Sequence, residues 1–193
     1  MGADIRFGPA RWGALTVALV NTAPYERQED LLTTKAQLRA LLLAHDEPAP
    51  VDIDDRDLAD ARQARDALGA VFSAREGNQG NQGHQNVAAL LNDLLARTAQ
   101  PRLVEHEGVP LHLHVDPPGT SWGGWLAASG AMALALLIAE HGIDVLGRCD
   151  APGCEHVLLR TGPGPARRFC DSACASRTRV AAYRARQAQR REP

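Results

Sequence analysis

Apolar residues recur every three or four positions along most of the first 145 residues, which is the spacing of amphipathic helices. Five helices are predicted on this basis, at residues 12–20, 34 to Pro48, 54–75, 87 to Pro101 and 121–141. The first of these segments is short and could also form a strand. Thr34 and Gln37 have the spacing of a capping box, and Gly142 suits the end of the last helix. The N-terminal three quarters of the chain should therefore be mainly helical.

The helix predicted at 121–141 contains the most apolar stretch of the chain. Three glycines and Ser129 interrupt this stretch, so it falls short of the roughly 20 apolar residues that a spanning helix needs. We expect a buried core helix and no contact with a membrane. The N-terminus also lacks the pattern of a secretory signal, which predicts a cytoplasmic protein.

Residues 103–115 change from helical to alternating spacing. Apolar residues alternate there with His112 and His114, which predicts a strand hairpin that turns at 107–108. The two histidines should form the polar face of a strand. A metal site at this pair would need another ligand, and Glu105 across the hairpin is a conceivable one.

Ala and Leu supply most of the apolar side chains, and aromatic residues make up only 4% of the chain. Because Ala and Leu have high helix propensity, this composition supports a helical core. The segment 77–86 contains mainly Gly, Asn and Gln and offers no apolar side chains for burial. It is predicted to be a mobile loop.

Charge is divided unequally along the chain. Residues 160–193 carry nine arginines against Asp171 and Glu192, a balance of +7. Because the whole chain has a net charge of −2, residues 1–159 carry −9. An acidic body followed by a basic end indicates that this end meets an anionic partner.

All four cysteines lie near the C-terminus, in a C-x4-C pair and a C-x3-C pair separated by fifteen residues, at Cys149, Cys154, Cys170 and Cys174. Two closely spaced pairs can supply the four thiolates of a tetrahedral zinc site. Disulfides or unrelated free thiols are the alternatives, but nothing indicates export, and cytosolic thiols stay reduced. We predict one structural zinc ion, because four thiolates leave no open position for catalysis.

The segment between the two cysteine pairs is predicted to fold back as a hairpin. Its strands would be 157–159 and 167–169, joined by a turn rich in Gly and Pro. His156 is a rival zinc ligand, although an ordinary residue beside the turn explains it better.

A final helix is predicted from about residue 172, capped by Asp171 or Ser172, and it is rich in Arg. Its arginines form two stripes about 140° apart, with alanines between them. Such a helix suits a nucleic-acid groove, where Arg contacts phosphates and bases. The predicted nucleic-acid-binding residues are Arg167, Arg168, Arg177, Arg179, Arg184 and Arg186. The alternative is a solvated helix that docks on the body through its alanine face.

Several motifs resemble a known family. The segments CDAPGC (149–154), RRFC (167–170) and CASRTRVAAYRAR (174–186) resemble the CGNR-type zinc finger. The segments LVNTA (19–23), DLLTTKAQLRALL (30–42), LNDLLA (91–96) and PRLV (101–104) resemble the ABATE domain that usually precedes this finger. The resemblance implies a stress-responsive bacterial transcription regulator with a DNA-binding zinc finger, whose four zinc cysteines fall on the four cysteines of this chain.

The CGNR signature itself falls on residues 174–177 of this chain. Its Cys and Arg are present as Cys174 and Arg177, but Ala175 and Ser176 replace the Gly and Asn. Zinc binding tolerates these changes. A DNA contact made by the Gly-Asn pair does not carry over to this chain.

We therefore predict a mainly α protein with a small β-hairpin. A helical domain at 1–144 would precede a treble-clef- or ribbon-like four-cysteine zinc finger with a basic terminal helix at 145–193. No acid, base and nucleophile cluster is visible, so we expect a DNA-binding regulator and not an enzyme. A zinc-stabilised module that binds protein or RNA is the alternative. The helical domain would sense a small-molecule effector or an oligomeric state. Its three tryptophans could line a pocket, but as buried core side chains they would need no such role.

Overall fold

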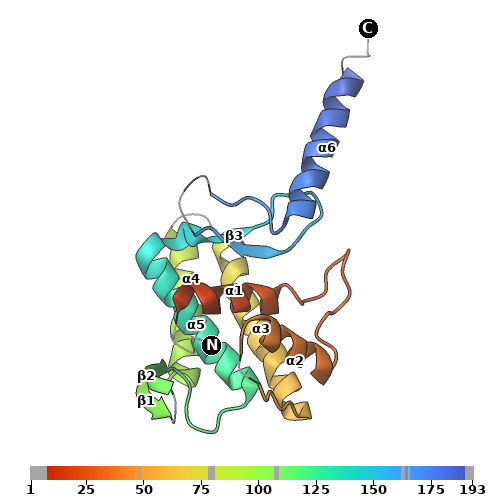
Figure 1. The fold of residues 1–193 in the computed structure, drawn as a ribbon. Helices are drawn as coiled ribbons and strands as arrows, with labels where there is room; N and C mark the ends of the chain where they lie inside the picture. The colour runs from red at the N-terminus through yellow and green to blue at the C-terminus, as the bar shows by residue number, and fades with distance from the viewer. Residues whose placement is uncertain are drawn as a thin grey trace.

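The computed structural model describes residues 8–47, 49–77, 81–106, 109–161, 164 and 166–189. Helix α5 (Trp122–His141) runs through the middle of the helical region, and α1 (Pro9–Val20), α3 (Asp55–Gly77) and α4 (Asn81–Thr98) pack around it (Figure 1). Among these described residues, α5 is the one helix long and apolar enough to cross a membrane. It is largely buried inside the protein, which confirms the predicted core helix.

Local capping signals fix where the predicted helices begin. Thr34 and Gln37 form the expected capping box at the start of α2 (Lys35–Ala44). The carboxylates of Asp54 and Asp57 likewise each accept a hydrogen bond from the other's backbone N–H, at 2.7 and 3.0 Å, where α3 begins. At the C-terminal end of α5, Gly142 adopts φ of 78° and caps the helix as predicted.

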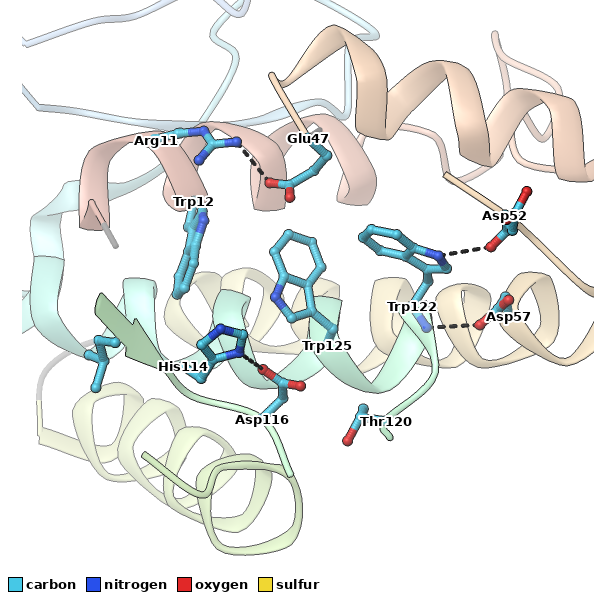
Figure 2. Close-up of a pocket in the computed structure, with 11 residues that line it drawn as sticks. Arg11, Trp12, Glu47, Asp52, Asp57, His114, Asp116, Thr120, Trp122 and Trp125 are labelled. Carbon is cyan, nitrogen blue, oxygen red and sulfur yellow. Dashed lines mark hydrogen bonds and ion pairs between the residues drawn. The ribbon is translucent and has the colours of Figure 1, made fainter. Parts of the chain in front are cut away.

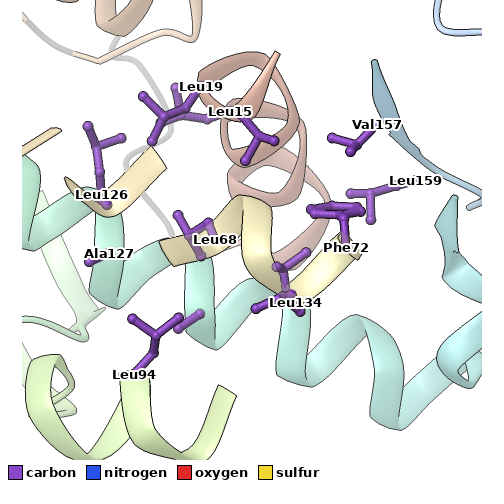
Figure 3. Packing of buried hydrophobic residues seen from close by; sticks show 14 of the residues in the cluster. Leu15, Leu19, Leu68, Phe72, Leu94, Leu126, Ala127, Leu134, Val157 and Leu159 are labelled. Atoms are coloured by element: carbon purple, nitrogen blue, oxygen red, sulfur yellow. The ribbon is translucent and has the colours of Figure 1, made fainter. Parts of the chain in front are cut away.

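The apolar core is built mostly from leucine, as the composition predicts. Figure 3 shows side chains of α1, α3, α4 and α5 meeting in one cluster, with Leu68 and Leu134 fully buried near its centre. Val157 and Leu159 join the same cluster from the C-terminal region. The C-terminal region therefore rests on the helical body through shared apolar packing.

The structure corrects the prediction for the Gly/Asn/Gln segment. The predicted mobile loop at 77–86 is helical from Asn81 onward, as the first turns of α4, and α3 extends to Gly77. Gln82 Nε2 donates to Asn86 Oδ1 across one turn at 3.1 Å, and this polar pairing supports the helix without apolar burial. The remaining part of the predicted loop, 78–80, lies outside the described residues.

The predicted N-terminal hairpin is present, as strands β1 (Arg102–His106) and β2 (Val109–His114) in antiparallel register. Its predicted turn at 107–108 lies outside the described residues. The expected orientation of its faces is wrong: Leu111 is 62% exposed, whereas His112 is buried, with its Nε2 atom 3.0 Å from Nε2 of His114. No third potential ligand among the described residues joins these two histidines into a metal site.

A second hairpin lies after α5 and a short 3-10 turn (Ile143–Val145). Strand β3 (Leu146–Arg148) pairs antiparallel with β4 (Val157–Leu159). The prediction that 157–159 pairs with 167–169 is therefore wrong. Leu146 and Leu159 are buried partners in this register and belong to the main core, so apolar packing selects β3 as the partner of β4. The terminal helix α6 (Ser172–Gln189) then projects away from the body (Figure 1).

Candidate metal centre and basic helix

The first cysteine pair lies in the turn between β3 and β4. Cys149 follows β3, and its N–H donates to the carbonyl of His156 at 2.9 Å. The N–H of Cys154 donates to the carbonyl of Ala151 at 3.0 Å and closes the turn. Gly153 has φ of 70°, a left-handed conformation that favours glycine. The short turn thus brings the two sulfur atoms to one side of the hairpin.

The second cysteine pair lies at the start of α6. Cys170 precedes the helix, and Cys174 is in its first turn. The Asp171 carboxylate accepts a hydrogen bond from the N–H of Cys174 at 2.6 Å, which confirms the predicted cap and holds the pKa of Asp171 below its usual value. The N–H of Asp150 donates to the carbonyl of Arg168 at 2.8 Å, and this bond draws the second pair towards the first.

The four sulfur atoms lie close enough together to share one zinc ion. All four are within 4.8 Å of one another, with Cys154 and Cys170 separated by 3.8 Å and Cys170 and Cys174 by 3.4 Å. A tetrahedral site with zinc–sulfur bonds of about 2.3 Å separates its sulfurs by about 3.8 Å. The donor chemistry and the spacing therefore fit zinc, and four protein ligands make the site structural.

In the absence of metal, the local environment favours protonated thiols at Cys170 and Cys174. Although burial opposes it, backbone hydrogen bonds from Cys170 and Ala151 instead lower the pKa of Cys149. Burial, together with hydrogen bonding of the Cys170 thiol to neighbouring sulfurs such as that of Cys174, raises the pKa of Cys170, and burial raises the pKa of Cys174 to about 11. Zinc would displace these protons and join β3, β4 and α6 at one point. The ion would thereby replace the apolar core that so small a module lacks.

Three of the predicted DNA-contacting arginines are partnered within the finger. Arg168 Nε forms an ion pair with Asp150 at 2.7 Å, and Arg167 donates to backbone carbonyls of its own segment. Arg177 Nη2 donates to the sulfur of Cys174 at 2.9 Å. A guanidinium at this position offsets part of the negative charge of a four-thiolate site. These exposed side chains thus have structural partners as well as access to solvent.

The other three arginines extend along the exposed length of α6. Arg179 makes a single long contact, 3.4 Å to the hydroxyl of Ser176. Arg184 and Arg186 form no hydrogen bond or ion pair with any residue that the structure describes. No acidic residue occurs between 172 and 189. The helix therefore presents positive charge at Arg184 and Arg186 that no described residue neutralises.

The alanine face of α6 does not dock on the body. Ala181, Ala182 and Ala185 are exposed, and the helix points away from the core (Figure 1). Val180 and Tyr183, on a different face, are 49% and 58% exposed. The alternative of a helix packed against the body through its alanines is therefore wrong.

A polar junction joins the finger to α1, and no sequence pattern indicated it. Asn21 donates to the carbonyl of Val157 at 3.0 Å and accepts from its N–H at 2.8 Å, so one side chain satisfies both backbone groups. His156 Nε2 lies 2.8 Å from Oε1 of Gln28, so the ring is engaged with the body and not with the cysteines. Gly13 permits this close approach, because an added Cβ would lie 2.8 Å from a methyl of Leu159.

Comparison with known families agrees with this arrangement. Residues 13–148 match the ABATE family, described as "Putative stress-induced transcription regulator", and residues 146–187 match the CGNR zinc finger. No curated protein shows a significant match to the chain. The ABATE match covers more than half of the sequence, and the finger match contains all four clustered cysteines. The chain therefore belongs to the ABATE family and carries a CGNR zinc finger whose four cysteines can hold one zinc ion.

Proposed function

We propose that this protein is a cytoplasmic transcription regulator that binds DNA through residues 145–193 and does not act as an enzyme. The observation that carries the proposal is the position of α6. Its first turn is anchored to the metal centre by Cys174, while Arg179, Arg184 and Arg186 lie exposed on a helix that leaves the body. In this proposal the helical domain, 1–144, senses a signal or an oligomeric state.

The charge distribution supports contact through the C-terminal region alone. Residues 1–159 carry a net charge of −9 and would repel the phosphate backbone, whereas α6 contains arginines and no acid. Because α6 projects from the body, a duplex can approach its arginines without meeting the acidic helices. Each phosphate contact would release counterions and make binding strongly dependent on salt.

The small side chains of α6 suit a groove. An α-helix fits the major groove of DNA, and exposed alanines between arginine stripes leave room for close approach. Arg177 is held at the Cys174 sulfur, which places it at the base of the helix. With Ala175 and Ser176 in the signature, base recognition would depend on the rest of the helix.

The test is fluorescence anisotropy of labelled duplexes, selected from a random pool, against the zinc-loaded full chain at several salt concentrations. The informative variant is Arg184→Ala/Arg186→Ala, because these side chains have no described partner inside the protein. We expect affinity to fall by about tenfold or more and the salt slope to fall by about two.

A matched control removes the same charge from the body. Arg56 and Arg97 are 81% and 61% exposed on α3 and α4, so Arg56→Ala/Arg97→Ala should leave DNA affinity within about twofold. Equal losses in the two double variants would show that net charge alone matters. No preference among duplexes, together with unchanged binding by the α6 variant, would contradict the proposal.

Val180 and Tyr183 favour a second candidate function, a zinc-stabilised module that docks on another protein. Large apolar side chains half exposed on a free helix are typical of a helix that binds in a protein groove. In that case Val180→Ser/Tyr183→Ser should abolish capture of a co-purifying protein, while the double arginine variant should have little effect. DNA-selective binding that survives Val180→Ser/Tyr183→Ser would favour the first candidate.

A further inference from the structure

All three tryptophans of the chain line one pocket in the helical body (Figure 2). Trp12 comes from α1, and Trp122 and Trp125 come from the first turn of α5. The rings of Trp12 and Trp125 are 5.8 Å apart and those of Trp122 and Trp125 are 5.6 Å apart, both pairs edge to face. The pocket has a volume of about 450 Å³, within the usual range for small-molecule sites.

Carboxylates dominate the charged lining of this pocket, which includes Glu47, Asp52, Asp57 and Asp116. Arg11 is the arginine in the lining, and its Nη2 atom donates to Glu47 Oε1 at 2.9 Å and to the carbonyl of His45 at 3.0 Å. The guanidinium is thus already hydrogen-bonded to neighbouring acceptors, and its charge offsets that of Glu47. The pocket is left with excess negative charge beside three aromatic rings.

Asp116 is the carboxylate of this pocket with a buried oxygen that lacks a hydrogen-bond donor among the described residues. Its residue is only 8% exposed, and its Oδ1 atom is buried without a hydrogen-bond partner among the described residues. The nearby His114 Nδ1 lies 3.8 Å from Oδ1, which is too long for a hydrogen bond. Asp57, by contrast, accepts from the N–H groups of Trp122 and Asp54. A buried carboxylate that lacks a donor is costly, so a ligand that donates from the pocket to the Asp116 carboxylate would bind favourably.

We propose that this pocket binds a small organic ammonium ion that has N–H donors on an apolar or aromatic body. The electron-rich indole faces attract a cation, and Asp116 supplies a charge-assisted hydrogen bond to its N–H group. A carboxylate ligand would meet excess negative charge, with Arg11 already engaged. A quaternary ammonium ion has no N–H to satisfy Asp116.

The pocket is also connected to the finger through α1. Trp12 lies on this helix, and Asn21 follows its last residue and holds both backbone groups of Val157. Ligand contact with Trp12 can therefore bias the position of β4 and the metal centre. This role as an effector site rests on the proposed regulatory function, whereas ligand binding itself does not.

The test is calorimetric titration of the zinc-loaded full chain, with intrinsic fluorescence as a second readout because every tryptophan lies in the pocket. The probes are benzylammonium, 2-phenylethylammonium and cyclohexylammonium, at concentrations up to about 10 mM. Neutral 2-phenylethanol and anionic 3-phenylpropanoate have a similar body with a different charge. We expect at least one ammonium ion to bind about tenfold or more tightly than the alcohol, and no binding of the anion.

Asp116→Asn should remove this preference for the cation, while Asp93→Asn, an exposed carboxylate on α4, should keep it. Thermal melts establish that each variant is folded, and Trp122→Leu, which should weaken ammonium binding several-fold, provides a second test if Asp116→Asn does not fold. Absence of binding by all three ammonium ions, equal binding of the anion, or unchanged binding in folded Asp116→Asn would overturn the proposal. DNA is not used in these titrations, so failure of DNA binding would leave their result intact.

Discussion

The helical body and the zinc finger are stabilised by different forces. The body buries a large cluster of leucines, alanines and valines around α5. The finger has its own small cluster, in which the buried members are Cys149, Ala151 and Cys174. A cluster this small cannot offset the conformational entropy of its loops, so the finger must depend on its metal. The region that we propose contacts DNA can then be small, charged and exposed, because it does not have to supply its own core.

Removal of zinc should have the largest effect of the changes considered, and it should unfold the finger while the body stays folded. Structural zinc in small fingers contributes on the order of 10 kcal/mol, so chelation or Cys174→Ser should unfold residues 149–175. The α1–α5 core should remain folded. Hydrogen exchange across the two regions, measured under reducing conditions, would show fast exchange in the finger and continued protection in α5.

Ser176→Ala is the control for this experiment, because it changes an exposed residue of the same helix that is not a ligand. Addition of zinc to the chelated wild type should restore protection. Slow exchange over 149–175 after complete metal removal would show that the finger is held by packing against the body instead.

In the body, substitutions at the centre of α5 should lower the free energy of unfolding most. Leu134 is fully buried, and Leu134→Ala should lower the free energy of unfolding by about 3–4 kcal/mol through lost burial and a cavity. Leu136→Ala on the same helix, where the side chain is 39% exposed, should cost about 1 kcal/mol or less. Urea unfolding followed by circular dichroism measures both, and equal losses would contradict a core centred on Leu134.

The junction between the two regions should depend on Asn21. Asn21→Ala leaves the N–H and carbonyl of Val157 without a partner and should cost about 2 kcal/mol. The amide of Val157 should then exchange faster, while α5 is little affected. Asn92→Ala, an exposed position on α4, is the matched control. If the Val157 amide keeps its wild-type protection in Asn21→Ala, apolar packing alone holds the finger to α1.

Sequence patterns predicted the features that depend on local chemistry. The Thr34–Gln37 capping box, the core helix at 121–141 and the clustered cysteines follow from spacing between neighbours, and the structure has all three. The partner of β4 could not be found in this way, because three-residue strands have no periodicity and the main core selects Leu146 as a partner.

The roles of single polar residues also could not be predicted from the sequence, because they depend on contacts between distant parts of the chain. Asn21 lies in a motif that supports the family resemblance, but its bonds to Val157 cross 136 positions of the chain. No sequence pattern assigned a role to Asp116, and only the fold places it beside the tryptophans. The composition of 77–86 does not predict the helix from Asn81, because the apolar residues that bury α4 lie further along the chain.

The smallest expected effect concerns the ion pair between Arg65 and Asp30 in the helical body. Arg65 is only 6% exposed, and its Nη1 atom lies 2.8 Å from Asp30 Oδ1, while its Nε atom bonds the exposed Asp66 at 3.0 Å. Although partial burial opposes it, the N–H of Leu32 and the Arg65 guanidinium lower the pKa of Asp30. Asp30→Asn should therefore cost about 1 kcal/mol at neutral pH, because Arg65 loses one charged partner.

The pH dependence of the free energy of unfolding distinguishes the contribution of the Asp30–Arg65 pair from that of the metal centre. A carboxylate with a lowered pKa in the folded state stabilises the protein above its unfolded pKa, near 3.8, and this contribution disappears as pH falls through the folded value. The stability difference between wild type and Asp30→Asn should thus narrow in acid, when metal-free samples are compared by urea unfolding. Asp66→Asn should have a smaller effect at every pH, since that carboxylate is 68% exposed. A gap that stays constant down to pH of about 2 would show that Asp30 acts through packing and not through its charge.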